Sequence, residues 1–236
     1  MLIYAKTHKG LVRPTNQDSL LVAHNLYGVA DGMGGHRGGE TASRIAVQVV
    51  RTVLQGKTPE DATLRISMEA ANRRIFEMQR HELALSGMGT TLTMLWEGRK
   101  EMHIAHVGDS RAYLFRAGEL IQHTDDHSIV GELLRNRVIT PAMAKTHPYR
   151  SVITRALGTD PVVEPDVLCL EKQVGDVWLV CSDGLYNMVE DDQIAQILAD
   201  AEGEQAADRL LEAALANGGH DNVSLVLGCV TEVTTL

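Results

Sequence analysis

The chain has 236 residues, 44% of them hydrophobic, which is enough for one sizeable core, so we expect a single domain over residues 1–236. Its 31 acidic residues outnumber its 22 basic ones and give a net charge of -9, which argues against nucleic acid as a partner because a phosphate polyanion would be repelled. No stretch approaches the roughly 18 apolar residues of a membrane helix, and the apolar run before Lys6 is too short for a signal peptide.

Hydrophobic periodicity predicts two long helices in the N-terminal third of the chain. Apolar residues recur every three or four positions from Gly38 to a break at Gly56, and a second stripe follows Pro59 and continues to Met78. Short apolar runs predict strands around and after these helices. We expect strands at residues 27–30, 90–96, 102–107, 112–115, 177–181 and 223–230.

The region from about residue 125 to residue 164 has a different character. Prolines and basic residues replace the strand rhythm, which predicts an inserted flap. Two further helical stripes, at residues 194–198 and 207–215, precede the final strand and end at Asn217. Several strands are apolar on both faces, which favours an α+β fold whose sheets are covered on each side.

Three cysteines occupy apolar surroundings and form no CxxC pair. We interpret Cys169, Cys181 and Cys229 as reduced core residues, because the count is odd and no signal peptide is present. The expected location is the cytoplasm.

Four aspartates stand at the ends of predicted strands. Asp31 is followed by Gly32, Asp109 and Asp183 follow later strands, and Asp221 lies just before the last strand. Each could form a tight turn. If the strand ends converge, the carboxylates would repel one another unless cations held them, and hard oxygen ligands suit Mg²⁺ or Mn²⁺. Spacing alone leaves both interpretations open.

An ordered set of short motifs spans essentially the whole chain. It comprises Arg13, Asp18, Asp31-Gly32-Met33-Gly34-Gly35, Gly89-Thr90-Thr91, Gly108-Asp109-Ser110, Ser182-Asp183-Gly184 and Asp221-Asn222. Each motif alone is weak evidence for a family, but the set in this order resembles the motifs of the bacterial branch of the protein phosphatase 2C family. The resemblance implies an α-β-β-α sandwich of two antiparallel sheets flanked by helices, with a small flap insertion.

The resemblance also implies two tightly bound Mn²⁺ or Mg²⁺ ions and a position for a third. Asp31 would bridge the first two ions, the carbonyl group of Gly32 would bind one of them, and Asp183 and Asp221 would complete the other. Asp109, together with Asp183, matches the ligands of the third ion. These assignments come from the family pattern.

The implied reaction is hydrolysis of phosphoserine and phosphothreonine in proteins. A water bridging two cations would attack phosphorus, while Arg13, at the position of the family's phosphate-binding arginine, takes up charge on the phosphoryl oxygens. A cysteine nucleophile is disfavoured, because the residue six positions after Cys181 is Asn187 and not an arginine.

Two positions depart from the family pattern. Gln17 replaces a glutamate that many members carry beside Asp18, so Asp18 either takes part in the metal site or forms a turn. Met33 stands where eukaryotic relatives have a histidine proposed as general acid, which leaves His36 and His147 as candidates, with a metal-bound water as the alternative.

Other polar residues receive structural interpretations. We expect Thr90 and Thr91 to support the sheet beneath the site, Arg111 to pair with a nearby carboxylate, and Asp126 or Ser128 to cap a helix.

Two alternatives to a protein phosphatase stay open: a non-catalytic phosphoprotein-binding module on the same fold, and a phosphatase of small phosphate esters. Retention of Asp31, Asp183 and Asp221 argues against the first. The resemblance implies phosphorylated proteins as partners, substrates of a cognate serine/threonine kinase. We expect a monomer that binds neither nucleic acid nor membrane.

Overall fold

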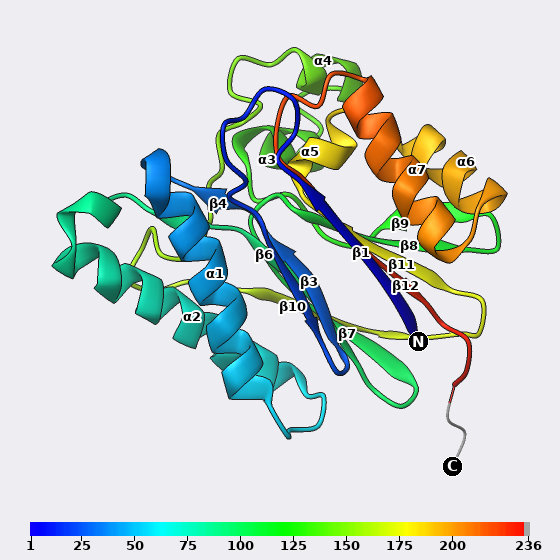
Figure 1. Ribbon diagram of the computed structural model, residues 1–236, viewed down its shortest axis with the longest axis horizontal. Helices are drawn as coiled ribbons and strands as arrows, with labels where there is room; N and C mark the ends of the chain where they lie inside the picture. Colours follow the sequence, from blue (N-terminus) through cyan, green and yellow to red (C-terminus); the bar gives the residue numbers. More distant parts are fainter. Residues whose placement is uncertain (234–236) are drawn as a thin grey trace.

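Two five-stranded antiparallel sheets, packed face to face, form the centre of the molecule (Figure 1). The computed structural model describes residues 1–233, without the side chains of residues 35–37. The first sheet has the order β1 (Leu2–His8), β12 (Val223–Cys229), β11 (Val177–Cys181), β8 (Arg111–Arg116) and β9 (Glu119–Gln122). The second has the order β10 (Asp166–Glu171), β7 (Glu101–Val107), β6 (Leu92–Glu97), β3 (Leu26–Ala30) and β2 (Ser19–Ala23). A two-stranded ribbon joins β4 (Gly32–Met33) to β5 (Gly89–Thr90).

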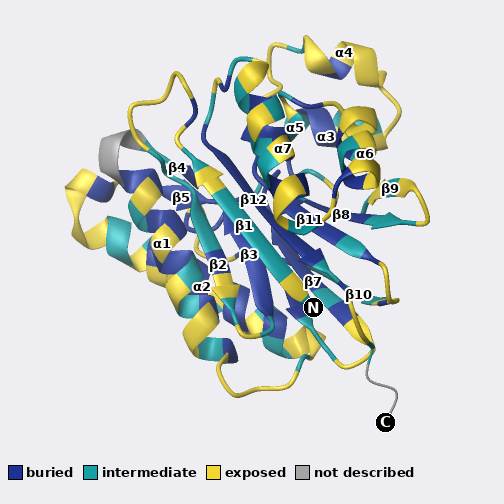
Figure 2. Cartoon of the chain, turned by 45° about the vertical axis from the view of Figure 1, so that its right-hand side comes forward, coloured by how far each residue is buried: buried dark blue, intermediate teal, exposed yellow. Residues whose placement is uncertain are grey.

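Helices cover the outer face of each sheet, as Figures 1 and 2 show. The second sheet carries α1 (Gly35–Leu54) and α2 (Asp61–His81), which a 3₁₀ turn at Leu83–Leu85 follows. The first sheet carries α5 (Asp183–Tyr186), α6 (Asp191–Asp200) and α7 (Gly203–Ala216). In the part of the chain that the structure describes, no helix is both long enough and apolar enough to span a membrane.

The strand β11 is buried on both faces, which explains why its sequence is apolar without alternation. Leu179 and Cys181 pack into the core beneath α5–α7, whereas Trp178 and Val180 point into the core between the two sheets. Burial of a large apolar side chain stabilises the fold by about 1.5–3 kcal/mol, so both faces contribute. The predicted α-β-β-α sandwich is confirmed.

The predicted elements are present with small shifts of their bounds. The strand expected at residues 90–96 is divided into β5 and β6, because Thr91 between them hydrogen-bonds to Asp31 instead of continuing the ladder. Five strands, β1, β2, β4, β9 and β10, and the short helix α5 were not predicted from the sequence. β1, β2, β9 and β10 are the edge strands of the two sheets, and their residues are in part exposed.

The segment between β9 and β10 contains α3 (Ile129–Arg135) and α4 (Pro141–Lys145). Ser128 caps α3, since its hydroxyl oxygen accepts a hydrogen bond from the backbone N–H of Gly131 at 3.0 Å, which confirms the capping interpretation. A β-bridge joins Leu157 to Thr90, so the end of the segment is attached to β5 of the β4–β5 ribbon. The treatment of residues 125–164 as a flap subdomain stays a prediction.

The three cysteines are free thiols, but they are not all core residues. Cys181 is buried, and burial raises the pKa of its thiol. Cys229 is partly buried. Cys169 is exposed, because it lies on the edge strand β10, and its assignment to the core was therefore wrong.

Candidate active site

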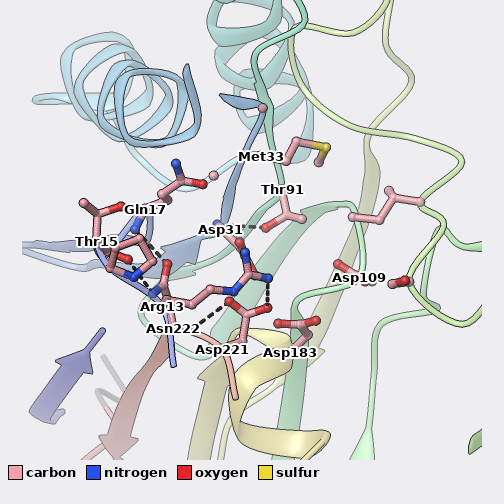
Figure 3. Close-up of a pocket in the computed structure, with 15 residues that line it drawn as sticks. Arg13, Thr15, Gln17, Asp31, Met33, Thr91, Asp109, Asp183, Asp221 and Asn222 are labelled. Atoms are coloured by element: carbon pink, nitrogen blue, oxygen red, sulfur yellow. Dashed lines mark hydrogen bonds and ion pairs between the residues drawn. The ribbon is translucent and has the colours of Figure 1, made fainter. Parts of the chain in front are cut away.

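A cleft of about 550 Å³ opens at one end of the sandwich (Figure 3). Four carboxylates line it, those of Asp31, Asp109, Asp183 and Asp221, together with the guanidinium group of Arg13. The convergence of these strand ends, which spacing alone left open and the family resemblance implied, therefore occurs in the structure.

Each of the four aspartates stands next to a strand of one of the two sheets. Asp31 directly follows β3, and Asp109 lies in the turn between β7 and β8. Asp183 is the first residue of α5, which begins two residues after β11, and Asp221 lies two residues before β12. The strands end at this edge of the sandwich, so both sheets contribute acidic groups to one cleft.

The backbone of Asp31 is fixed by the neighbouring strand. Its N–H donates to Oγ1 of Thr91 at 3.0 Å, and its carbonyl oxygen accepts from the N–H of Thr91 and from Oγ1 of Thr90, each at 2.8 Å. The next residue has to be glycine, because a Cβ on Gly32 would collide with the carbonyl oxygen of Gly39. Thr90 and Thr91 thus support the site, as predicted, and Thr91 also lines the cleft.

Asn222 fastens the N-terminal loop to the start of β12, a role that the sequence analysis missed. Its Nδ2 donates to the carbonyl oxygens of Lys9 and Thr15, both at 2.9 Å, and its Oδ1 accepts from the backbone N–H of Gln17 at 2.8 Å. These three bonds hold the loop that carries Arg13. In the sequence, Asn222 stood out as part of the Asp221-Asn222 motif and as a polar residue directly before an apolar strand.

Arg13 reaches across the mouth of the cleft to a carboxylate. Its Nη2 donates to Oδ2 of Asp221 at 2.6 Å (Figure 3). The Arg13 side chain is half exposed, so its guanidinium group is accessible to a bound anion.

Burial and mutual repulsion of the carboxylates dominate the electrostatics of the cleft. Burial, and then the charges of the other aspartates, raise the pKa values of Asp31 and Asp183 well above the ordinary range. Burial and Asp126 raise the pKa of Asp109 to about 7. Burial also raises the pKa of Asp18 to about 6, although Ser182 donates a hydrogen bond to its Oδ2 at 2.9 Å. Such a cluster favours bound cations.

Unpaired oxygens indicate where cations would fit. Oδ1 of Asp18 and Oδ1 of Asp183 are buried, and neither has a hydrogen-bond partner. Among the described residues, no three acidic, histidine or cysteine side chains close around a single point. Mg²⁺ and Mn²⁺ do not require such a cage, because they retain several waters and use one or two carboxylates each. The donor set therefore fits hard divalent cations.

The sequence pattern of the family described as protein phosphatase 2C matches residues 10–217. The chain belongs to the protein phosphatase 2C family. Among its relatives is the serine/threonine protein phosphatase PstP of Mycobacterium tuberculosis, with 41% identity over 97% of this chain, although the chain spans only 45% of that relative. The serine/threonine phosphatase stp of Listeria welshimeri is 37% identical, with 94% of this chain and 93% of the relative covered.

Solved structures of protein phosphatase 2C relatives have the same fold. The crystal structure of the Mycobacterium tuberculosis phosphatase PstP superposes with a TM-score of 0.92 at 40% identity and covers 98% of both chains. The catalytic domain of PstP in complex with two manganese ions superposes with a TM-score of 0.90 at 38% identity, also over 98% of both chains.

The remaining predicted residues of this protein phosphatase 2C chain are placed as follows. Met33 lines the cleft. The side chain of His36 lies outside the described residues, so its role stays a prediction. His147 does not line the cleft; its Nδ1 accepts a hydrogen bond from the backbone N–H of Tyr149 at 3.2 Å within the 125–164 segment. Asp18 lies just behind the lining residues and close enough to Asp31 for its charge to raise the pKa of Asp31, whereas a hydrogen bond with Asp31 lowers the pKa of Asp18.

Arg111 is an ion-pair partner, as predicted. It forms two hydrogen bonds with the carboxylate of Asp126, at 2.8 and 2.9 Å, and its guanidinium carbon lies 3.7 Å from the ring centroid of Tyr186. Tyr186 in turn donates to the carbonyl oxygen of Asp109 at 2.9 Å. This chain of contacts stabilises the turn that presents the Asp109 carboxylate.

Proposed function

We propose that this chain is a metal-dependent phosphatase that hydrolyses phosphoserine and phosphothreonine in proteins. The observation that carries the proposal is the cleft, in which buried, mutually repelling carboxylates stand beside an accessible guanidinium group. Family membership and relatives that are named serine/threonine phosphatases support it, as does the relative crystallised with two manganese ions.

In this proposal the carboxylates divide the work of holding Mn²⁺ or Mg²⁺. Asp31 and the carbonyl group of Gly32, with Asp183 and Asp221, would hold two ions, and Asp109 with Asp183 would hold a third. When bound, these ions supply Lewis-acid charge for the phosphate oxygens and lower the pKa of water. The chain needs to supply no covalent nucleophile.

Asp18 supports this arrangement from behind the lining residues. Its Oδ2 is held by the hydroxyl group of Ser182, and its Oδ1 has no hydrogen-bond partner. We propose that the unpaired oxygen binds an ion directly or through a water. The neutral amide at Gln17 then leaves Asp18 as the carboxylate contributed by this part of the loop.

Arg13 is placed to bind the substrate phosphate. Its planar fork of donors matches two phosphate oxygens, and its hydrogen-bond partner at the cleft mouth is Asp221. A phosphorylated side chain entering the cleft would compete with Asp221 for Arg13, while Asp221 becomes available to a cation. Substrate binding and completion of the metal site would therefore favour each other.

The segment 125–164 is proposed as a flap beside the cleft. Ser151 and Ile153 of this segment line the cleft. They are in a position to contact residues that flank the phosphorylated one. Within the proposal, this segment affects protein substrates more than small esters.

The cellular context is also a proposal. We infer a monomeric cytoplasmic signalling enzyme whose substrates are proteins phosphorylated by a cognate serine/threonine kinase. The free thiols support a reducing compartment, and the net charge of -9 disfavours polyanions as partners.

Phosphate release from phosphothreonine, phosphoserine and phosphotyrosine peptides tests the proposed function. We expect turnover of the first two with Mn²⁺, none with a chelator, and a loss of at least about 100-fold for Asp183→Asn. Asp192→Asn, a change of an exposed carboxylate on α6, is the matched control and should retain full activity. Binding of phosphopeptides without turnover would indicate a non-catalytic module, and turnover confined to a small aryl phosphate would indicate an esterase of small phosphates.

A further inference from the structure

A second cluster of reactive side chains lies outside the cleft, on the sheet that α1 and α2 cover. It consists of Asp61 on α2, His103 on β7 and Cys169 on β10. Nδ1 of His103 lies 2.7 Å from Oδ1 of Asp61, and Nε2 of His103 lies 3.9 Å from Sγ of Cys169. The imidazole thus stands between a carboxylate and a thiol.

These contacts determine which ring nitrogen of His103 carries the hydrogen. A carboxylate only accepts, so Nδ1 of His103 carries the hydrogen that is shared with Asp61. In the neutral ring, the lone pair on Nε2 then faces the thiol of Cys169. This is the arrangement of nucleophile, base and orienting carboxylate used in covalent catalysis. Because the two partners bind opposite ring nitrogens, the three groups form a relay and do not surround a metal ion.

The fold determines this placement. Cys169 and His103 are directly paired residues of the antiparallel strands β10 and β7, so their side chains lie on the same face of the sheet. Asp61 is the first residue of α2, which packs against these strands. Because β10 is the edge strand, Cys169 is exposed, whereas the His103 side chain is only 12% exposed. The base is held in place while the nucleophile is accessible.

We propose that Cys169 is a modification site that undergoes thiol–disulfide exchange with low-molecular-weight disulfides, with His103 as general base and Asp61 as the group that orients it. Sulfur of Cys169 attacks one sulfur of the disulfide RS–SR while its proton passes to Nε2 of His103. A new Cys169–SR bond forms and the RS–SR bond breaks. The departing thiolate takes the proton and leaves as RSH, so the exchange is balanced and is reversed by a reducing thiol.

Charges near Cys169 make a proton acceptor necessary. Burial and the carboxylates of Asp61 and Glu101 raise the pKa of the Cys169 thiol. A resting thiolate is therefore disfavoured, and the proton has to be removed as the sulfur attacks. Simple electrostatics predicts that neutralising either carboxylate speeds the reaction, whereas the relay predicts that loss of Asp61 slows it.

This difference in sign defines the experiment. The probes are 5,5′-dithiobis(2-nitrobenzoate) and glutathione disulfide, used on the full chain with Cys229→Ala; Cys181 is buried, and mass spectrometry locates the modified residue. We expect His103→Gln to lower the rate at Cys169 at least about tenfold. Asp61→Asn should lower it several-fold, and Glu101→Gln, the matched control, should leave it unchanged or raise it.

Two readouts exclude a loss of folding as the cause. Circular dichroism should show unchanged unfolding for Asp61→Asn, whose side chain is half exposed. Added imidazole should restore the rate of His103→Gly, which a purely structural role would not allow. An unchanged or faster reaction in both His103→Gln and Asp61→Asn would overturn the proposal, as would modification at Cys229 or Cys181 in place of Cys169 in the unaltered chain.

Discussion

Replacing Arg13 with alanine separates the contact seen in the structure from the one proposed for the substrate. Nη2 of Arg13 lies 2.6 Å from Oδ2 of Asp221, and the two side chains are 53% and 34% exposed. An ion pair this exposed contributes at most about 1 kcal/mol. Its loss frees Asp221 and removes a positive charge, so Mn²⁺ should bind more tightly, but by no more than about fivefold.

The expected effect on turnover is much larger. Hydrogen bonds to charged groups contribute about 1.5–3 kcal/mol each, and a guanidinium fork forms two with a phosphate. Two such bonds total about 3–6 kcal/mol, so Arg13→Ala should lower kcat/KM for a phosphothreonine peptide by at least about 100-fold. Arg13→Lys, which retains the charge without the fork, should give an intermediate loss.

Steady-state kinetics at several Mn²⁺ concentrations distinguishes the two roles. Arg73→Ala, a change of an exposed arginine on α2, serves as the control and should behave as the unaltered chain. A change in kcat/KM of less than about threefold for Arg13→Ala would refute the assignment to phosphate. So would a loss that additional Mn²⁺ fully restores, because Arg13 would then act through Asp221.

Three further perturbations test other parts of the structure. Burial lowers the pKa of His106 to about 4, below its unfolded value near 6.5. The folded state therefore has about 3 kcal/mol of stability that is present above pH 6.5 and is lost as the pH falls to 4. His106→Gln should flatten the pH dependence of the free energy of unfolding between these values, and an unchanged pH dependence would contradict the assignment. Gly184→Ala should lower activity at least about tenfold, measured with saturating Mn²⁺, because its Cβ would collide with the carbonyl oxygen of Asn222; full activity would show that this packing does not hold the site. Asp18→Ala should weaken Mn²⁺ binding in a calorimetric titration, and an unchanged affinity would remove Asp18 from the site.

The sequence predicted those parts of the fold whose pattern is local. The strand Val177–Cys181 is apolar on both faces and has the predicted bounds. The strand Leu2–His8 was missed, because it contains Lys6 and pairs with β12, more than 200 residues along the chain. Edge strands such as Asp166–Glu171 mix exposed and partly buried residues and give no clear alternation.

For the site too, only its local features could be predicted from the sequence. Aspartates at strand ends were visible in the sequence, but their convergence depends on a sheet order that places β12 between β1 and β11. The bonds from Asn222 to Lys9 and Thr15 each join residues more than 200 positions apart, so no local pattern indicates them. The Asp61–His103–Cys169 cluster likewise requires the register of β10 against β7.

Metal content and turnover, measured together, test the central claim most directly. Chelator-treated chain is titrated with Mn²⁺ while bound metal and hydrolysis of a phosphothreonine peptide are recorded in the same samples. We predict no turnover without metal, full turnover once at least two ions are bound per chain, and loss of both bound metal and turnover in Asp31→Asn. Hydrolysis at the full rate by metal-free chain, or by Asp31→Asn, would contradict the account.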